Sequence, residues 1–304
     1  GVILQAKNKN IFTPLNHRFV PSKNLLAGKS IKEFKPYFCP AMFDFHKSYE
    51  VYFRYQHEST KEYILPVIQE RMKLGAQTRI IEIGCGEGGN LLSFMELGCE
   101  CIGIDLDEPK LNTGRTYFDQ TDYKDQVQFI HDDIYNRESE YRNAFDVILL
   151  KDVIEHIHDQ QKLINFMRLM LKPNGIIFFA FPPWHMPFGG HQQVMRKKIP
   201  SLLPYTHLLP LPLYKLYLKG MGESDSSIAH LVEIKETGIS IERFERCIRN
   251  AKLSIILRQL YLINPNYKWK FGLKPRKLWK LFSAIPFFRN FYCTTAYYMI
   301  GSKP

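Results

Sequence analysis

Three histidines, His156, His185 and His191, are the side chains of this sequence best suited to moving a proton. Each follows an apolar run typical of a buried strand, and the carboxyl ends of parallel strands meet at the sheet edge where ligands bind. Imidazole titrates near neutral pH, which suits general-base catalysis. We expect His191 to be the base, with His185 and then His156 as alternatives; the other interpretation is that these rings only brace their loops.

A metal site is the other chemistry that His156 suggests. Asp152 and Glu155 lie close to it in the sequence and carry the oxygen ligands that magnesium prefers. No second set of ligands lies near them in the sequence, so we predict no bound metal. The six cysteines form no CxxC pair and no zinc-finger spacing with histidine, which indicates reduced thiols in a cytoplasmic protein.

A glycine-rich turn lies between a predicted buried strand and a predicted helix at residues 80–90. Gly84, Gly86 and Gly89 satisfy the pattern GxGxxG, in which the backbone turns sharply and approaches a ligand without a Cβ in the way. Asp105 ends the next strand, where a carboxylate can accept both hydroxyls of an adenosine ribose. These features fit an NAD-linked dehydrogenase as well as other adenosine-binding proteins.

Three further features distinguish these alternatives. Asp133 follows a predicted strand at a position where its carboxylate can accept the adenine amino group, with the Ile134 backbone facing the ring edge. The segment 145–157 places a strand end and a loop beside the glycine turn. The segment 171–175 ends a helix and opens the strand 176–181, which leads into a Pro-Pro-Trp sequence.

With these features the sequence resembles the class I S-adenosylmethionine-dependent methyltransferases, and among them the branch that includes the ubiquinone-biosynthesis O-methyltransferases. The resemblance covers residues 78–182 and extends to predicted strands at 253–263 and 294–300. It implies S-adenosylmethionine as methyl donor and S-adenosylhomocysteine as product. Carried over residue by residue, the implied cofactor contacts are Glu82, Gly84, Cys85, Gly86, Asp105, Leu106, Asp133, Ile134, Lys151 and Val153.

Two further residues near the implied cofactor need separate interpretations. In this family an N-terminal helix often folds over the cofactor, so Arg54 is a candidate partner for the cofactor carboxylate. Cys85 lies in the glycine turn, but the turn requires small residues for close packing. We therefore interpret this thiol as a packing residue and not as a nucleophile.

The elements that must position these residues form an alternating series. Apolar strands at 79–83, 101–105, 127–130, 146–150 and 175–181 alternate with helical segments at 89–97, 108–119 and 159–171. This alternation predicts an α/β, doubly wound and mainly parallel sheet. The resemblance implies seven strands in the order 3-2-1-4-5-7-6 with the last strand antiparallel. N-terminal helices and a lid insertion after strand 5 complete the expected fold.

The chain divides into four expected parts. Residues 1–74 form an N-terminal arm and helical cap, and 75–182 form the Rossmann-like core that binds S-adenosylmethionine. Residues 183–240 break the alternation and are interpreted as a lid or substrate insertion. Residues 241–304 supply the strands that close the sheet, with a basic amphipathic insertion at 264–291.

Positive charge is concentrated in the C-terminal part of the chain. Residues 184–304 hold 19 Lys and Arg against 6 Asp and Glu, or +13, which leaves −2 of the total of +11 for residues 1–183. Segments 202–218 and 274–291 mix cations with large apolar residues, which suits either a hydrophobic lid or peripheral contact with an anionic membrane. The apolar runs are too short to span a bilayer. We expect a cytoplasmic protein that can associate with a membrane.

The acceptor is less constrained by the sequence than the methyl donor. We expect O-methylation of a hydrophobic, lipid-linked or glycan-like small molecule. The alternatives are an RNA or protein methyltransferase and a methyltransferase-like binding module without catalysis. No RNA-binding module is appended and the cations lie among aliphatic residues, so nucleic acid ranks below a small-molecule acceptor. The oligomeric state is open.

Overall fold

A computed structural model describes residues 49–124 and 126–302 of the 304-residue chain. The predicted extended arm at the N-terminus lies outside the described residues. Among the described helices, none has both the length and the apolar character needed to cross a bilayer.

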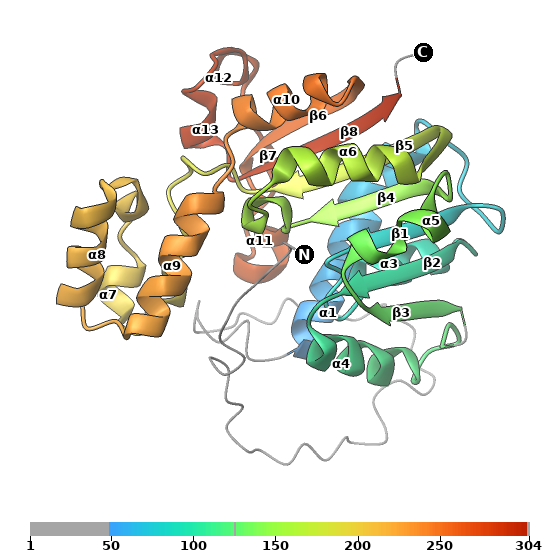
Figure 1. Cartoon of the computed structure of the whole chain (residues 1–304), viewed down its shortest axis with the longest axis horizontal. Helices are drawn as coiled ribbons and strands as arrows, with labels where there is room; N and C mark the ends of the chain where they lie inside the picture. The colour runs from blue at the N-terminus through green and yellow to red at the C-terminus, as the bar shows by residue number, and fades with distance from the viewer. Residues whose placement is uncertain (1–48, 125, 303–304) are drawn as a thin grey trace.

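One twisted sheet organises the fold (Figure 1). Five parallel strands lie in the order β3-β2-β1-β4-β5, and β8 pairs antiparallel with both β5 and β6. The strands are β1 (Arg79–Ile83), β2 (Glu100–Asp105), β3 (Val127–His131), β4 (Phe145–Lys151), β5 (Leu171–Phe181), β6 (Leu253–Ile263), β7 (Arg276–Lys277) and β8 (Thr295–Ser302). The predicted fold class and strand order are confirmed.

One part of the expected sheet is corrected. The described chain forms eight strands and not seven, because β7 pairs with the outer edge of β6. This two-residue strand comes from the segment 264–291, which was expected to be an insertion outside the sheet. Arg276 and Lys277 are both exposed, and polar residues at a short sheet edge discourage pairing with another chain.

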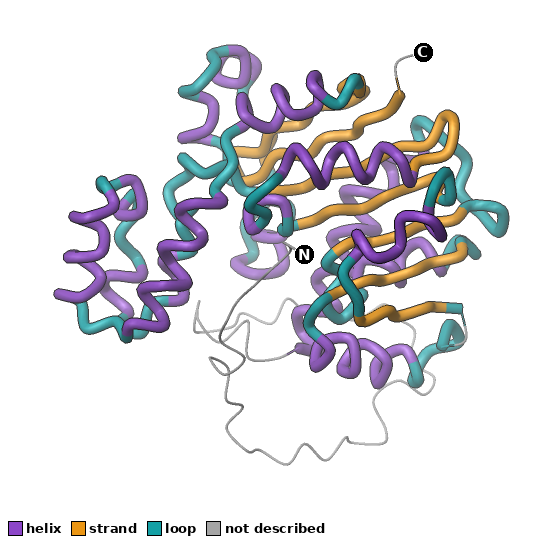
Figure 2. The backbone as a smooth tube through the Cα atoms, viewed as in Figure 1, coloured by secondary structure: helices purple, strands orange, loops and turns teal. Residues whose placement is uncertain are grey.

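Helices cover both faces of the sheet (Figure 2). On one face α6 (Gln160–Met170) and α10 (Ile241–Asn250) pack into the larger hydrophobic core, and on the other α1 (Tyr49–Ser59), α2 (Leu65–Gln69), α3 (Gly89–Met95) and α4 (Glu108–Phe118) surround a second core. The central strands β1, β4 and β5 are buried almost throughout because both faces are covered. A short π-helix, Thr60–Ile64, joins α1 to α2, and α5 (Glu138–Tyr141) precedes β4.

The segment after β5 leaves the sheet and forms a separate helical unit. Its helices are α7 (Lys198–Ser201), α8 (Leu211–Gly220) and α9 (Asp225–Thr237), and they stand beside the strand ends in Figure 1. Four buried side chains, Met195, Tyr214, Leu218 and Leu231, give this unit a small core of its own. Between β6 and β8 the chain forms α11 (Asn266–Phe271), α12 (Lys280–Ala284) and α13 (Arg289–Tyr292).

Candidate active site

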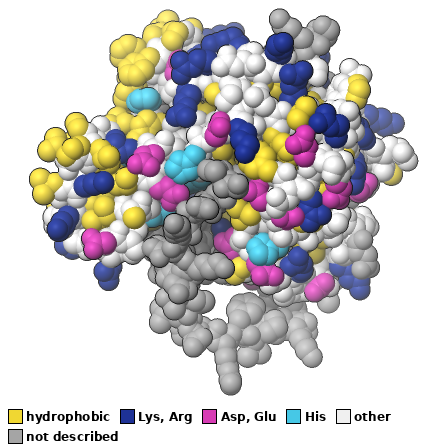
Figure 3. All heavy atoms as spheres, in the orientation of Figure 1, with side chains coloured by type: hydrophobic (Ala, Val, Ile, Leu, Met, Phe, Trp, Pro, Cys, Tyr) yellow, Lys and Arg dark blue, Asp and Glu magenta, His cyan; other side chains and the backbone are white. Residues whose placement is uncertain are grey.

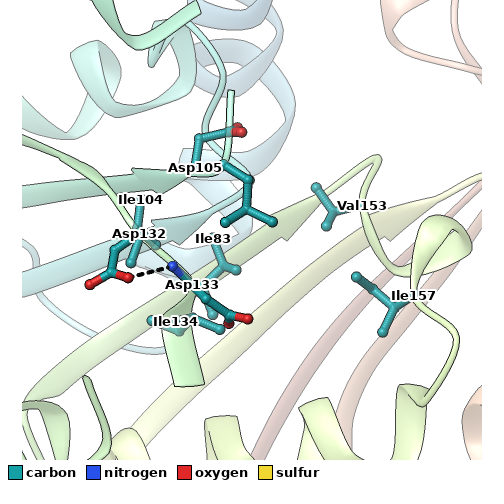
Figure 4. A pocket seen from close by; sticks show the side chains of 10 residues that line it. Ile83, Ile104, Asp105, Asp132, Asp133, Ile134, Val153 and Ile157 are labelled. Atoms are coloured by element: carbon teal, nitrogen blue, oxygen red, sulfur yellow. Dashed lines mark hydrogen bonds between the residues drawn. The ribbon is translucent and has the colours of Figure 1, made fainter. Parts of the chain in front are cut away.

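A cavity opens at the carboxyl ends of β1, β2, β3 and β4 (Figure 4). Parallel strands end together at this edge, so the loops that follow them converge. The cavity has an apolar wall and a row of carboxylates, and its lining consists of Ile83, Gly84, Ile104, Asp105, Leu106, Asp132, Asp133, Ile134, Val153 and Ile157. An apolar cavity with a few polar groups suits a nucleoside.

The glycine turn brings the backbone against this cavity. Gly84 and Gly86 have φ angles of 71° and 54°, in the left-handed region that favours glycine. A Cβ on Gly84 would lie 2.5 Å from Cγ2 of Val153. The N–H of Gly86 donates to Oδ2 of Asp105 at 2.7 Å, and the N–H of Asp107 donates to Oδ1 at 2.9 Å. Asp105 therefore orients the turn while lining the cavity.

Two consecutive aspartates, Asp132 and Asp133, follow β3 and line the same cavity. Oδ1 of Asp133 accepts the N–H of Tyr135 at 3.0 Å, and Oδ1 of Asp132 accepts the N–H of Asp133 at 2.8 Å. Asp132 also pairs with Arg137 at 2.8 Å. The sequence interpretation singled out Asp133 but missed Asp132, whose adjacency to Asp133 was the available signal.

A buried polar cluster lies beneath the glycine turn. Asn90 Nδ2 donates to Glu82 at 2.6 Å, while Asn90 Oδ1 accepts from Lys151 at 3.0 Å and from Thr60 at 2.7 Å. Burial raises the pKa of Glu82 to about 8 and lowers the pKa of Lys151. Within the described residues, Oε2 of Glu82 has no hydrogen-bond partner. Glu82 and Lys151 were expected near the cofactor; Asn90 and Thr60 were missed because an amide and a hydroxyl at helix ends are common without function.

The cavity gathers six of the eleven cofactor candidates. The six that line it are Gly84, Asp105, Leu106, Asp133, Ile134 and Val153. Of the other five, Glu82, Gly86 and Lys151 lie in the turn and the cluster below it. Cys85 is fully buried, which raises its pKa and accords with a packing role. Arg54 pairs with Glu50 at 2.7 Å on its own helix and does not line the cavity, so its role at the cofactor carboxylate stays a prediction.

Two of the three candidate bases, His156 and His191, are in contact. The rings of His156 and His191 lie 5.0 Å apart in an edge-to-face arrangement. His191 has a φ angle of 53°, which marks a sharply turned backbone. Burial lowers the pKa of His156 to about 4, with further lowering from His230 and Lys110, so this ring is neutral at physiological pH. His185 instead contacts Phe287 and Phe291 at ring distances of 5.3 and 5.5 Å.

The buried carboxyl group of Glu155 lies beside this pair of histidines. One ligand atom from each of Glu155, His156 and His191 lies within 4.8 Å of the others. Glu155 is 4% exposed, burial raises its pKa, and its Oε2 has no hydrogen-bond partner within the described residues. The sequence showed no second ligand near Glu155 and His156, and that reason against a metal is wrong, because the fold supplies His191. The absence of a metal stays a prediction.

The helix α11 brings a charged residue, Lys270, near Asp152, and the sequence did not reveal this proximity. Asp152 follows β4 with a φ angle of 56°, and its N–H donates to the carbonyl of Ala180 at 2.7 Å. Burial raises the pKa of Asp152, while the charges of Lys151 and Lys270 oppose that shift. Lys270 lies on α11, which packs against α1. A helix from the C-terminal part of the chain thus returns to the strand ends.

Comparisons with known proteins identify the family of this chain. The family described as "Methyltransferase domain" matches residues 53–215, more than half of the chain. The chain is similar to the ubiquinone biosynthesis O-methyltransferase of Proteus mirabilis, with 28% identity over 38% of this chain and 46% of that protein. It is also similar to the enzyme of the same name from Histophilus somni, with 26% identity over 43% of this chain and 58% of that protein. The chain spans about half the length of the curated relatives it matches.

A solved structure supports the fold. A Galdieria sulphuraria protein assigned as a sarcosine dimethylglycine methyltransferase superposes with a TM-score of 0.52 at 15% identity, covering 79% of this chain and 84% of that chain. At this identity the likeness concerns the fold alone. From the family match, the glycine turn and the acidic residues at the ends of β2 and β3, we conclude that the chain belongs to the class I S-adenosylmethionine-dependent methyltransferases.

Proposed function

We propose that this protein transfers the methyl group of S-adenosylmethionine to a hydroxyl of a hydrophobic, lipid-linked or glycan-like small molecule. The observation that carries the proposal is that Asp105 and Asp133, at the ends of the adjacent strands β2 and β3, line one cavity beside the glycine turn (Figure 4). A carboxylate pair so placed fits the ribose hydroxyls and the adenine amino group of one adenosine. Ile134 and Val153 supply the apolar walls for the rings.

Each group around the cavity has a defined part in holding the donor. Gly84 has no side chain and therefore leaves room next to Val153. Asp105 holds the turn and presents its oxygens to the ribose. Glu82 and Lys151 lie below the turn, where the amino-acid end of the donor would bind. S-Adenosylmethionine supplies an electrophilic methyl group on a sulfonium, so these residues mainly align two reactants and exclude water.

His191 is proposed as the general base. In the transfer an oxygen–carbon bond forms, the carbon–sulfur bond breaks, and the acceptor hydroxyl loses its proton to imidazole. His156 lies 5.0 Å away, and because burial lowers its pKa to about 4 it is neutral and does not repel the cation that His191 becomes. The segment 183–240 acts in this proposal as the lid that carries His191 and His185 to the acceptor.

The acceptor class rests on the apolar surroundings of the lid. The curated relatives are named as ubiquinone biosynthesis O-methyltransferases, which accords with a hydroxyl acceptor on a hydrophobic molecule. RNA is disfavoured because the cations of the insertion alternate with exposed aliphatic side chains, which cannot stack on bases. The five described cysteines are all unpaired and buried, which accords with a cytoplasmic, reducing environment.

Calorimetric titration with S-adenosylmethionine, S-adenosylhomocysteine and NAD tests the donor. We expect micromolar binding of the two adenosyl ligands and none of NAD. Binding of NAD alone would overturn the proposal. Release of S-adenosylhomocysteine is then measured with a panel of long-chain phenols and catechols, and with a structured RNA as the comparison. Turnover with RNA alone would replace the small-molecule acceptor.

The base is tested with His191→Gln, which keeps a polar side chain but cannot accept a proton at neutral pH. We expect kcat to fall by about 10² to 10⁴ while the donor Kd stays within about twofold. The control is His158→Gln, an exposed histidine that pairs with Glu233, and it should keep kcat. Equal loss of donor affinity in His191→Gln would assign this residue to the cofactor site instead.

A further inference from the structure

The exposed apolar side chains of this protein are concentrated in two segments. Of the eighteen large hydrophobic residues exposed in the described part of the chain, eight lie between residues 194 and 216 and seven between 273 and 292. Several are exposed to an unusual degree, with Ile199 at 77%, Leu216 at 68%, Trp279 at 67% and Leu281 at 71%. Apolar surface gathered in this way marks an interaction site.

The fold joins the two segments into one surface. The ring of Tyr205 lies 6.2 Å from that of Phe291, and its hydroxyl donates to the Phe291 carbonyl at 3.5 Å. His185, from the start of the insertion, contacts both Phe287 and Phe291. Figure 3 shows hydrophobic side chains gathered along the same side of the molecule over the insertion helices and over α12 and α13. We call this combined region the apolar edge, defined by residues 194–221 and 273–292.

The charge of the apolar edge has one sign. It contains no Asp or Glu, and its exposed cations are Arg196, Lys197, Lys198, Lys215, Lys219, Lys274, Arg276, Lys277 and Lys280. None of these nine forms an ion pair with another described residue. The one further cation, Arg289, is buried and pairs with Glu242 and Glu245. The available charge is therefore unneutralised and interleaved with apolar side chains.

We propose that the apolar edge docks on an anionic lipid bilayer. Apolar side chains insert at the level of the acyl boundary while neighbouring lysines and arginines contact the phosphates, and Trp279 and Tyr292 suit the headgroup region. A protein partner would require acidic side chains to match nine cations, whereas an anionic bilayer supplies both acyl chains and negative charge. A second copy of this chain would place like charges together.

The docking gives the proposed function a route for its acceptor. His185 contacts the apolar edge and lies six residues before His191 in the same loop. A hydrophobic acceptor held in the bilayer would thus reach the loop of the proposed base without crossing water. This consequence rests on the proposed function, but the binding of the surface to lipid does not, so the two can fail separately.

Co-sedimentation of the full chain with vesicles tests the docking. Vesicles of phosphatidylcholine that contain about 30% of the anionic lipid phosphatidylglycerol are compared with vesicles of pure phosphatidylcholine. We expect binding to the anionic vesicles at least about tenfold tighter, with loss at high salt. Equal binding to both vesicles, or no binding to either, would overturn the proposal. Concentration-dependent self-association without vesicle binding would assign the surface to a second copy.

Paired variants test whether both segments take part. Ile199→Ser with Leu216→Ser removes apolar contacts on the insertion, and Trp279→Ser with Leu281→Ser removes them near α12. Each pair should weaken binding at least about tenfold. The matched control is Leu97→Ser with Leu169→Ser, two leucines that are each 37% exposed elsewhere on the molecule; this pair should bind as the wild type does. Equal weakening in the control would overturn the assignment of the surface.

Tryptophan fluorescence gives a readout that a general loss of folding does not imitate. The chain has three tryptophans, and Trp184 and Trp269 are half-buried while Trp279 is exposed. Brominated lipid should quench the emission of the bound protein, and Trp279→Phe should retain vesicle binding but lose most of the quenching. Unchanged quenching in Trp279→Phe would show that α12 does not face the lipid.

Discussion

The cavity at the strand ends and the apolar edge are built in different ways. In the cavity, the lining residues come from the ends of four neighbouring strands or from the loops that follow them, so the sheet brings together residues as far apart in the sequence as Gly84 and Val153. At the apolar edge, Tyr205 meets Phe291 across 86 residues of sequence, and α13 is anchored to α10 across 44 to 49 residues. The first region depends on the order of strands in the sheet, and the second on packing between helices and loops outside it.

The two regions should therefore respond differently to substitution. A strand end in a parallel sheet is fixed by the ladder and by the core on both faces, so a single side-chain change there affects the ligand more than the fold. The insertion has a small core of its own, and α13 is held to α10 by the ion pairs of Arg289. Changes there should alter stability and docking more than cofactor binding.

The largest expected effect is on the cofactor side. Asp105→Ala removes the proposed acceptor of two ribose hydroxyls and the acceptor for the Gly86 and Asp107 amides. Charged hydrogen bonds are worth about 1.5 to 3 kcal/mol each, so losing the two bonds to the ribose should raise the Kd for S-adenosylmethionine by about 10² to 10⁴. Isothermal titration measures the change. Asp119→Ala, an exposed aspartate at the end of α4, should bind normally; if Asp105→Ala also binds normally, the cavity assignment fails.

The next prediction concerns the free energy of unfolding and tests whether the two regions respond separately. Arg289 is 5% exposed and pairs with Glu242 at 2.9 Å and Glu245 at 3.1 Å. Removing one partner of a buried ion pair costs about 3 to 5 kcal/mol, so Arg289→Met should lower the unfolding free energy by that amount in urea titration. Arg258→Met is the matched control, since Arg258 contacts the same Glu245 at 3.2 Å but is 37% exposed.

Arg258→Met should lower the unfolding free energy by less than about 1 kcal/mol, because an exposed ion pair is screened by water. A similar loss in both variants would show that burial does not distinguish these two arginines. At a temperature where Arg289→Met is still folded, it should bind S-adenosylmethionine as the wild type does. Loss of cofactor affinity in the folded variant would contradict the separation of the two regions.

The smallest effect is a pH dependence of stability that comes from His156. Burial lowers the pKa of His156 from 6.5 to about 4, so folding favours the neutral ring. Its contribution to stability is fully present above pH 6.5 and is lost as the pH falls toward 4. Between pH 7 and pH 5 this contribution should fall by about 1 to 2 kcal/mol.

Thermal or urea unfolding of His156→Gln at both pH values measures that contribution. The stability lost by the variant on acidification should be smaller than that of the wild type by about the same 1 to 2 kcal/mol. His158→Gln should keep the wild-type dependence, since its side chain is 42% exposed. An unchanged dependence in His156→Gln would mean that the buried ring does not control the response.

The order of elements could be predicted from the sequence, and the site only in part. The alternation from β1 to β5 was readable because strands buried on both faces are continuous apolar runs. The two-residue β7 was not, because a pair of lysine and arginine residues carries no strand pattern. Asp105 and Asp133 were found because they follow strands, whereas Asn90 and Lys270 reach the site from helices whose patterns indicate only packing.

The glycine turn, the acidic strand ends and the family can be recognised from the sequence, because they depend on residues that are neighbours along the chain or one βαβ unit apart. Folding alone brings His191 beside His156 and Glu155, returns α11 to Asp152, and joins two basic apolar segments into one edge. These contacts join segments separated by 35 residues or more, and no local pattern encodes which of several amphipathic segments will pack together.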